Sequence, residues 1–117
     1  MGDWIDEYFA DVDAMRLEPW LDRHTDDVVV RFGNNPPAVG KEQVGQAIAG
    51  FWETIGGLRH TVRKSHQAGD TVTMEFDVTY ERTDGKEVTV PCASVLHRRG
   101  DLVDSLSVYI DLAPVYA

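Results

Sequence analysis

Near the N-terminus of the chain, apolar side chains recur every three or four residues, the spacing of one face of a helix. This stripe runs from Trp4 to Met15 and predicts a first amphipathic helix. Pro19 suits the first turn of a helix, so the segment 20–24 is predicted to form a second, short helix. The β-branched run over residues 28–32 then predicts a strand.

The segment 33–40, GNNPPAVG, fits neither a helix nor a strand, because glycine, asparagine and a Pro-Pro pair favour turns. We expect an irregular, shaped loop there. Helical spacing of apolar residues returns over 41–55, and the Gly56-Gly57 pair is a suitable C-terminal stop. A third helix is therefore predicted after the loop.

From Leu58 onward apolar and polar residues alternate, which is the period of a strand with one buried face. Four long antiparallel strands are predicted, over about 58–67, 71–82, 87–97 and 102–111. Gly-Asp or Asp-Gly pairs mark the hairpin turns between them. Helices followed by a run of antiparallel strands favour the α+β class. We predict one domain over residues 1–117, with a curved sheet wrapped around the N-terminal helices as a cone.

The second long strand fixes which side chains face the interior of this cone. Phe76 and Val78 lie on its apolar face, so Glu75 and Asp77 lie on the opposite face. A shift by one residue would bury two carboxylates and expose the apolar face, at a high cost in free energy. The alternation therefore predicts an apolar interior with the carboxylates outside.

Charge and cysteine content narrow the possible partners. The chain has 11 Lys and Arg against 20 Asp and Glu, a net charge of −9, which disfavours nucleic acid and anionic membranes as partners. Cys92 is the single cysteine, so neither an internal disulfide nor a cysteine zinc cluster is possible. The four histidines do not have the spacing of metal ligands, and we predict no metal and no cofactor. Short apolar runs and an N-terminus without a secretory pattern predict a cytoplasmic protein.

Two stretches resemble a known superfamily. RFGNNPPAVGKE (31–42) is similar to the strand, loop and helix of limonene epoxide hydrolase and ketosteroid isomerase. LVDSLSVYID (102–111) resembles the last strand of these proteins, which often ends in Arg-x-Tyr-x-Asp; Ser107 replaces the arginine, while Tyr109 and Asp111 match. The order of predicted elements agrees over nearly the whole chain. The sequence thus resembles the nuclear transport factor 2-like superfamily, in its SnoaL-like branch.

The resemblance implies a pocket inside the cone, but the residues usual for catalysis are replaced. Tyr8 matches the isomerase tyrosine, whereas Phe32 stands at the position of the base and Ala93 or Ser94 near that of the second acid. The five polar positions of the epoxide hydrolase are all apolar here, namely Val30, Phe32, Phe76, Val78 and Val108. Asp111 is the late carboxylate that matches the family, and alternation turns it outward. We therefore expect a domain that binds a small hydrophobic metabolite and lacks the usual catalytic carboxylates.

His60 shares the face of Leu58 and Val62, and its near-neutral pKa makes it a candidate base. The alternative is a core or rim histidine that is hydrogen-bonded to a backbone or tyrosine group. The residues predicted to contact a ligand are Tyr8, Phe32, His60, Phe76, Val78, Tyr80, Ser94 and Val108. Two alternatives remain open: a proton-transfer isomerase, cyclase or dehydratase with His60 as base, and an interaction module without a pocket. The resemblance also implies a homodimer formed through the outer face of the sheet.

Overall fold

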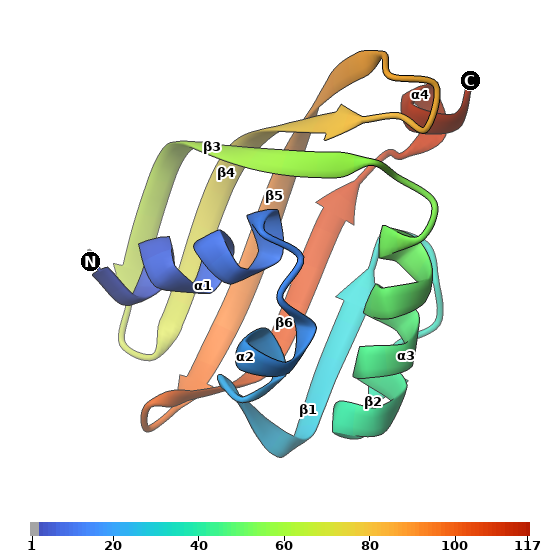
Figure 1. Cartoon of the computed structure of the whole chain (residues 1–117). Coiled ribbons are helices and arrows are strands. Elements are labelled where there is room, and N and C mark those ends of the chain that lie inside the picture. The colour runs from blue at the N-terminus through green and yellow to red at the C-terminus, as the bar shows by residue number, and fades with distance from the viewer. Residues whose placement is uncertain (1–2) are drawn as a thin grey trace.

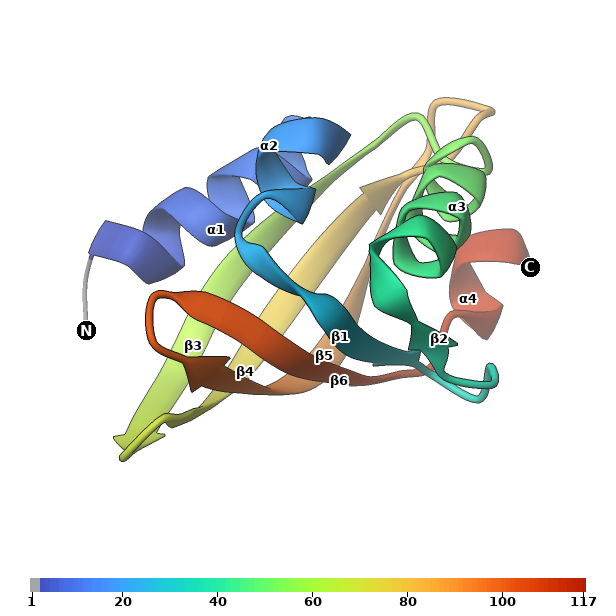
Figure 2. The same cartoon turned by 90° about the horizontal axis from the view of Figure 1, so that it is seen from below.

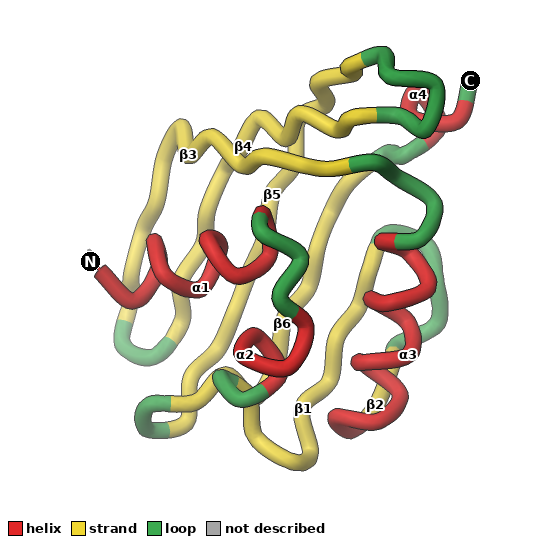
Figure 3. Tube along the Cα trace, in the orientation of Figure 1, coloured by secondary structure: helices red, strands yellow, loops and turns green. Residues whose placement is uncertain are grey.

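The structure is a computed structural model that describes residues 3–117. Its helices and strands follow one another along the chain as α1 (Asp3–Asp13), α2 (Leu17–Leu21), β1 (His24–Phe32), β2 (Ala38–Val39), α3 (Gly40–Trp52), β3 (Gly57–Ala68), β4 (Thr71–Glu81), β5 (Glu87–Arg99), β6 (Leu102–Ile110) and α4 (Ala113–Tyr116). Figure 1 shows this order from blue to red, and Figure 3 shows α1, α2 and α3 lying in front of the sheet.

The sheet has six strands in the order β2-β1-β6-β5-β4-β3. The four long strands form an antiparallel meander, while β1 pairs in parallel with β6 and antiparallel with β2. The sheet is curved, and α1, α2 and α3 lie on its concave side (Figure 2). This architecture confirms the predicted α+β cone, with an open sheet wrapped around the helices.

The predicted alternation in β4 is confirmed. Its apolar residues from Val72 to Tyr80 are buried, and Glu75 is exposed on the other face. Asp77 shares that outer face and pairs with Arg63 of β3 at 2.9 Å. Val62 pairs with Phe76 in the sheet but keeps 45% of its surface exposed, because β3 is an edge strand.

Several predicted boundaries were wrong. The second helix spans Leu17–Leu21 rather than 20–24, so His24 begins β1 instead of ending a helix. The 33–40 segment is not wholly irregular, since two of its residues form β2 against β1. The third helix ends at Trp52, before the glycine pair.

One acidic side chain of α1 lies in the interior instead of facing solvent. Asp11 is only 5% exposed. One of its oxygens bonds Arg23 Nε at 2.8 Å, and the other bonds Arg16 at 2.9 Å. Burial alone would raise the pKa of Asp11, but the hydrogen bonds from Arg23 and Arg16 outweigh it and lower the pKa. The two guanidinium groups therefore allow a charged carboxylate in the interior.

Candidate functional site

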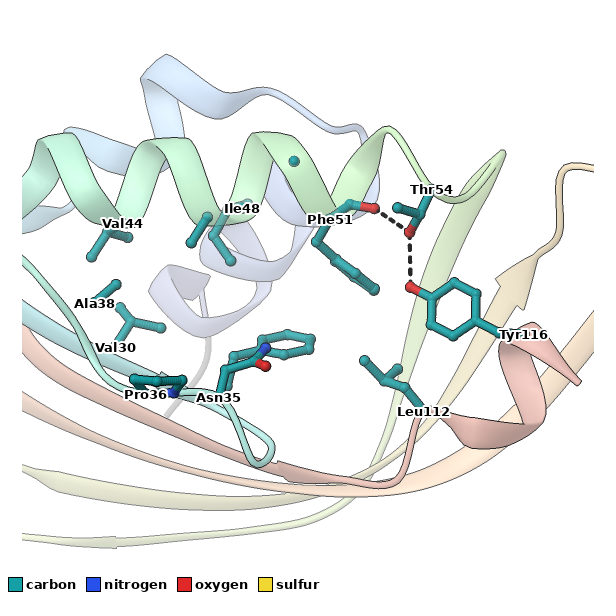
Figure 4. A pocket seen from close by; sticks show the side chains of 13 residues that line it. Val30, Asn35, Pro36, Ala38, Val44, Ile48, Phe51, Thr54, Leu112 and Tyr116 are labelled. Atoms are coloured by element: carbon teal, nitrogen blue, oxygen red, sulfur yellow. Dashed lines mark hydrogen bonds between the residues drawn. The ribbon is translucent and has the colours of Figure 1, made fainter.

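A cavity of about 440 Å³ lies between α3 and the sheet, closed at one end by α4 (Figure 4). We call it the chamber. Its walls come from β1, the 33–38 loop, α3 and the C-terminal segment; the residues are Val30, Phe32, Asn35, Pro36, Ala38, Val44, Ala47, Ile48, Gly50, Phe51, Thr54, Leu112 and Tyr116. The volume falls within the range of about 300–1,000 Å³ that is typical of small-molecule sites.

The walls of the chamber are mainly apolar because two regular elements turn the same kind of face toward it. Val44, Ile48 and Phe51 follow one another at the spacing of one helical face. Val30 and Phe32 alternate on the inner face of β1. The rings of Phe32 and Phe51 meet with centroids 5.0 Å apart, so the two elements join at an aromatic contact.

Two hydroxyl groups of the chamber meet beyond the C-terminal end of α3, where Thr54 lies beside Tyr116 at the end of α4 (Figure 4). Thr54 Oγ1 donates to the carbonyl of Phe51 at 2.6 Å. Because that bond uses the single hydroxyl proton of Thr54, the hydroxyl of Tyr116 donates to Thr54 Oγ1 at 2.8 Å. The oxygen of Tyr116 keeps lone pairs that can accept a hydrogen bond from a ligand.

A second hollow of about 450 Å³ adjoins the chamber and shares Phe32, Asn35 and Leu112 with it. We call it the vestibule. Its other lining residues are Gly33, Asn34, Ile110 and Asp111. The loop over this hollow is tied to β6, since the Gly33 amide donates to the Val108 carbonyl at 2.9 Å, and Gly33 has a φ of +57° that favours glycine.

Of the eight residues predicted to contact a ligand, Phe32 lies in the chamber wall. Phe76, Val78 and Ser94 are buried on the inner face of the meander, and Val108 is half-buried on β6. Tyr80 is buried beneath Phe51, with ring centroids 5.9 Å apart, and burial raises the pKa of its phenol. Apart from Phe32, the predicted residues belong to or pack near the core and do not line the chamber, and their contact with a ligand stays a prediction.

Tyr8 lies deep in the core. Its hydroxyl is 2.8 Å from Nε2 of His24, and His24 Nδ1 is 2.8 Å from the carbonyl oxygen of Trp20. A carbonyl oxygen only accepts, so Nδ1 carries the proton and Nε2 accepts from Tyr8. Burial raises the pKa of the Tyr8 phenol. Sequence reasoning missed this pair because it placed His24 in a helix.

His60 lies at the start of β3 and contacts α1. Its Nδ1 is 2.6 Å from Asp13 Oδ1, and its backbone amide donates to Asp13 Oδ2 at 3.1 Å. The ring packs against Phe9 and Phe76, with centroids 4.9 and 5.1 Å away. The structure thus gives His60 a carboxylate partner that the sequence had not suggested, since the helical pattern alone left Asp13 on a polar face.

Cys92 is buried, with its sulfur 3.9 Å from Ser94 Oγ, and burial raises the pKa of the thiol. Among residues 3–117, no group of three or more His, Cys, Asp or Glu side chains is arranged to hold a metal ion. Within the same range no helix combines the length and apolar character needed to cross a membrane.

A family model described as "SnoaL-like domain" matches residues 5–105. The chain belongs to the SnoaL-like family. The match runs from α1 into β6, so it includes β1 and α3, which form two walls of the chamber, and it ends before α4. No curated protein matches the chain.

Solved structures share the fold of this SnoaL-like domain. One is a hypothetical protein with a ketosteroid isomerase-like fold from Catenulispora acidiphila, in complex with trimethylamine (22% identity, TM-score 0.85, 95% of this chain and 87% of that one). TerC co-crystallised with polyporic acid has 17% identity and a TM-score of 0.83, over 96% and 92%. A putative SnoaL-like polyketide cyclase from Jannaschia has 20% identity and a TM-score of 0.76, over 94% and 87%. At these identities the similarity establishes the fold alone.

Proposed function

We propose that this SnoaL-like domain binds a small, largely apolar metabolite in the chamber between α3 and the sheet. The observation that carries the proposal is the chamber itself, about 440 Å³ with walls of aliphatic and aromatic side chains. SnoaL-like domains typically bind small molecules. Two structures with the same fold were determined with trimethylamine and with polyporic acid. A cavity of this size also favours binding over an interaction module without a pocket.

The composition of the chamber favours binding without acid–base chemistry. Its lining residues within 3–117 include no carboxylate, histidine, lysine or arginine. Its hydrogen-bonding side chains are those of Tyr116, Asn35 and Thr54, near the rim. Apolar walls with a few polar groups bind by burial of apolar surface and orient the ligand through those groups.

The neutral fluorescent probe N-phenyl-1-naphthylamine tests the proposal by titration. Ala47 lines the chamber, and Ala47→Phe should fill part of it and weaken probe binding at least about tenfold, because it removes space for about one aromatic ring. Gln46→Phe, on the same helix but outside the lining of the chamber, is the matched control and should bind as the wild type does. Equal affinity of Ala47→Phe and wild type would exclude the chamber as the site.

A second candidate function is favoured by the pair of Asp13 and His60. If Nδ1 of His60 donates to Asp13, the Nε2 atom keeps its lone pair, which is the form of a general base held by a carboxylate. Such a base could abstract a proton from carbon in an isomerase, cyclase or dehydratase reaction. The ring of His60 is packed by Phe9 and Phe76, so a substrate would need to reach Nε2 past these rings.

Deuterium uptake at the α-carbon of 2-tetralone in D₂O, followed by NMR, tests this candidate. His60→Ala should lower protein-dependent exchange at least about a hundredfold, because general-base catalysis contributes about that much or more. Asp13→Asn should lower it less, since the imidazole remains. Exchange that is as fast with His60→Ala as with wild type would contradict the role of His60.

We also infer a homodimer formed through the convex face of the sheet. Tyr109 of β6 is 56% exposed there and lines a shallow hollow together with Arg63, Glu75, Pro91 and Ala93. This face carries both signs of charge beside apolar surface. A two-fold interface brings the same patch from both copies together, so Arg63 of one copy can face Glu75 of the other.

A further inference from the structure

The charge on the described residues that line the chamber and the vestibule is of one sign, negative. Among the described residues that line either hollow there is no lysine, arginine or histidine, and there is one carboxylate, Asp111. The whole chain carries a net charge of −9, so the field of the molecule is also negative. An anionic ligand would enter this site without any cation to pair with it.

Asp111 is well placed to meet the polar end of a ligand. It follows the last residue of β6 and lines the vestibule, which shares Phe32, Asn35 and Leu112 with the chamber. Its Oδ1 accepts the backbone amide of Ala113 at 3.0 Å, which fixes the side chain at the start of α4. This bond leaves Oδ2 for a further donor.

The remaining polar groups of the vestibule also suit a cationic donor. The side chains of Asn34 and Asn35 each offer an amide oxygen that can accept a hydrogen bond. The ring of Phe32 borders both hollows, and an aromatic face attracts a cation electrostatically. A ligand that spans the junction would therefore have an apolar body in the chamber and a positively charged, hydrogen-bonding head beside Asp111.

We propose that the site selects cationic amphiphiles, with an ammonium group bound by Asp111 in the vestibule and an apolar group in the chamber. This inference rests on the proposed binding function and adds the chemical class of the ligand. The physical reason is that Asp111 is the charged group at the site and the lining offers no compensating charge to a carboxylate or phosphate.

Three probes with the same apolar chain test the proposal: n-octylammonium, n-octanol and octanoate, measured by isothermal titration calorimetry at pH 7 and low ionic strength. Wild type should bind n-octylammonium about two- to fivefold more tightly than n-octanol, the range expected for one partly exposed charge pair. Octanoate should bind more weakly than both. Added salt should reduce the preference for the amine, because it screens the charges.

Asp111→Asn keeps an oxygen that can accept the amide of Ala113 and removes only the charge. It should abolish the preference for n-octylammonium over n-octanol. Asp70→Asn, at the exposed turn between β3 and β4, is the matched control and should retain the preference. Asp111→Lys should reverse the order, so that octanoate binds more tightly than n-octylammonium.

The outcomes separate this inference from the function on which it rests. If none of the three probes binds wild type, the proposed function of the chamber fails. If n-octanol and n-octylammonium bind equally well, or Asp111→Asn keeps the amine preference, the chamber still binds ligands and the cationic selectivity is refuted. Binding of octanoate that is tighter than that of the amine would also refute the selectivity.

Discussion

At the scale of single residues, His24 is the side chain whose environment departs most from what its type suggests. It is completely buried, with Tyr8 on one ring nitrogen and the Trp20 carbonyl on the other. Burial lowers the pKa of His24 to about 4, against the raising effect of its backbone hydrogen bonds, and Lys41 and Arg23 lower it further. The histidine is therefore a neutral link between α1 and β1 at pH 7.

This pKa predicts a loss of stability in mild acid. Between pH 6.5 and 4 the unfolded chain binds a proton at His24 that the folded chain does not, so the free energy of unfolding falls as pH falls. The loss should reach about 3 kcal/mol at most, and the full stabilisation is present above pH 6.5.

Urea denaturation of wild type and His24→Asn at pH 7 and pH 4.5 measures this effect. The variant should be less stable at pH 7 and should depend less on pH, because the titrating group is gone. His66→Asn, on the exposed part of β3, should keep the wild-type pH dependence. An unchanged pH dependence in His24→Asn would assign the acid sensitivity to other groups.

At the scale of elements, Gly45 and Gly50 of α3 lie in very different surroundings. A Cβ atom added at Gly50 meets no atom within 4 Å, whereas one added at Gly45 lies 3.1 Å from Leu21 Cδ1 of α2. Glycine inside a helix costs stability because it has more backbone freedom to lose on folding. An alanine at position 50 therefore reports the gain in helix propensity alone, whereas an alanine at position 45 also reports the space available at the α2–α3 contact.

Gly50→Ala should raise the free energy of unfolding by about 0.5–1 kcal/mol, the difference in helix propensity between the two residues. Gly45→Ala should gain less or lose stability, because Leu21 must move to make room. Chemical denaturation of both variants with wild type gives the comparison. Equal gains at the two positions would show that the α2–α3 contact is looser than the structure indicates.

At the scale of the whole molecule, the curvature of the sheet sorts its two faces. The concave face holds the helices, the core and the chamber, while the convex face is uncovered within one chain (Figures 1 and 2). Pairing between copies at the outer strands, β2 and β3, would extend the sheet and leave the convex face uncovered. The proposed homodimer would cover the convex face of both copies.

Light scattering during gel filtration tests the dimer. Tyr109→Glu should shift the protein to a monomer, because it places two like charges near the axis of a two-fold interface. Tyr109→Phe keeps the ring and should remain dimeric. A monomeric wild type at micromolar concentration, or a dimeric Tyr109→Glu, would contradict an interface centred on this residue.

The pattern of apolar positions was sufficient to predict the fold class and the buried face of β4. The buried side chains from Val72 to Tyr80 confirm the alternation in β4. Strand periodicity is a local property, since each side chain is placed by its nearest neighbours in the chain. The family resemblance, carried by RFGNNPPAVGKE and LVDSLSVYID, was likewise readable from short stretches of sequence.

Only the tertiary structure decided which side chains meet. Asp13 and His60 are 47 positions apart, and Thr54 and Tyr116 are 62 apart, so no local pattern links them. The buried Asp11 is a similar case, because its place in the interior depends on two arginines outside its own helix. The chamber also follows from how α3 and α4 sit against β1. Sequence thus determined which residues turn inward, while the packing of distant segments determined which of them enclose a space.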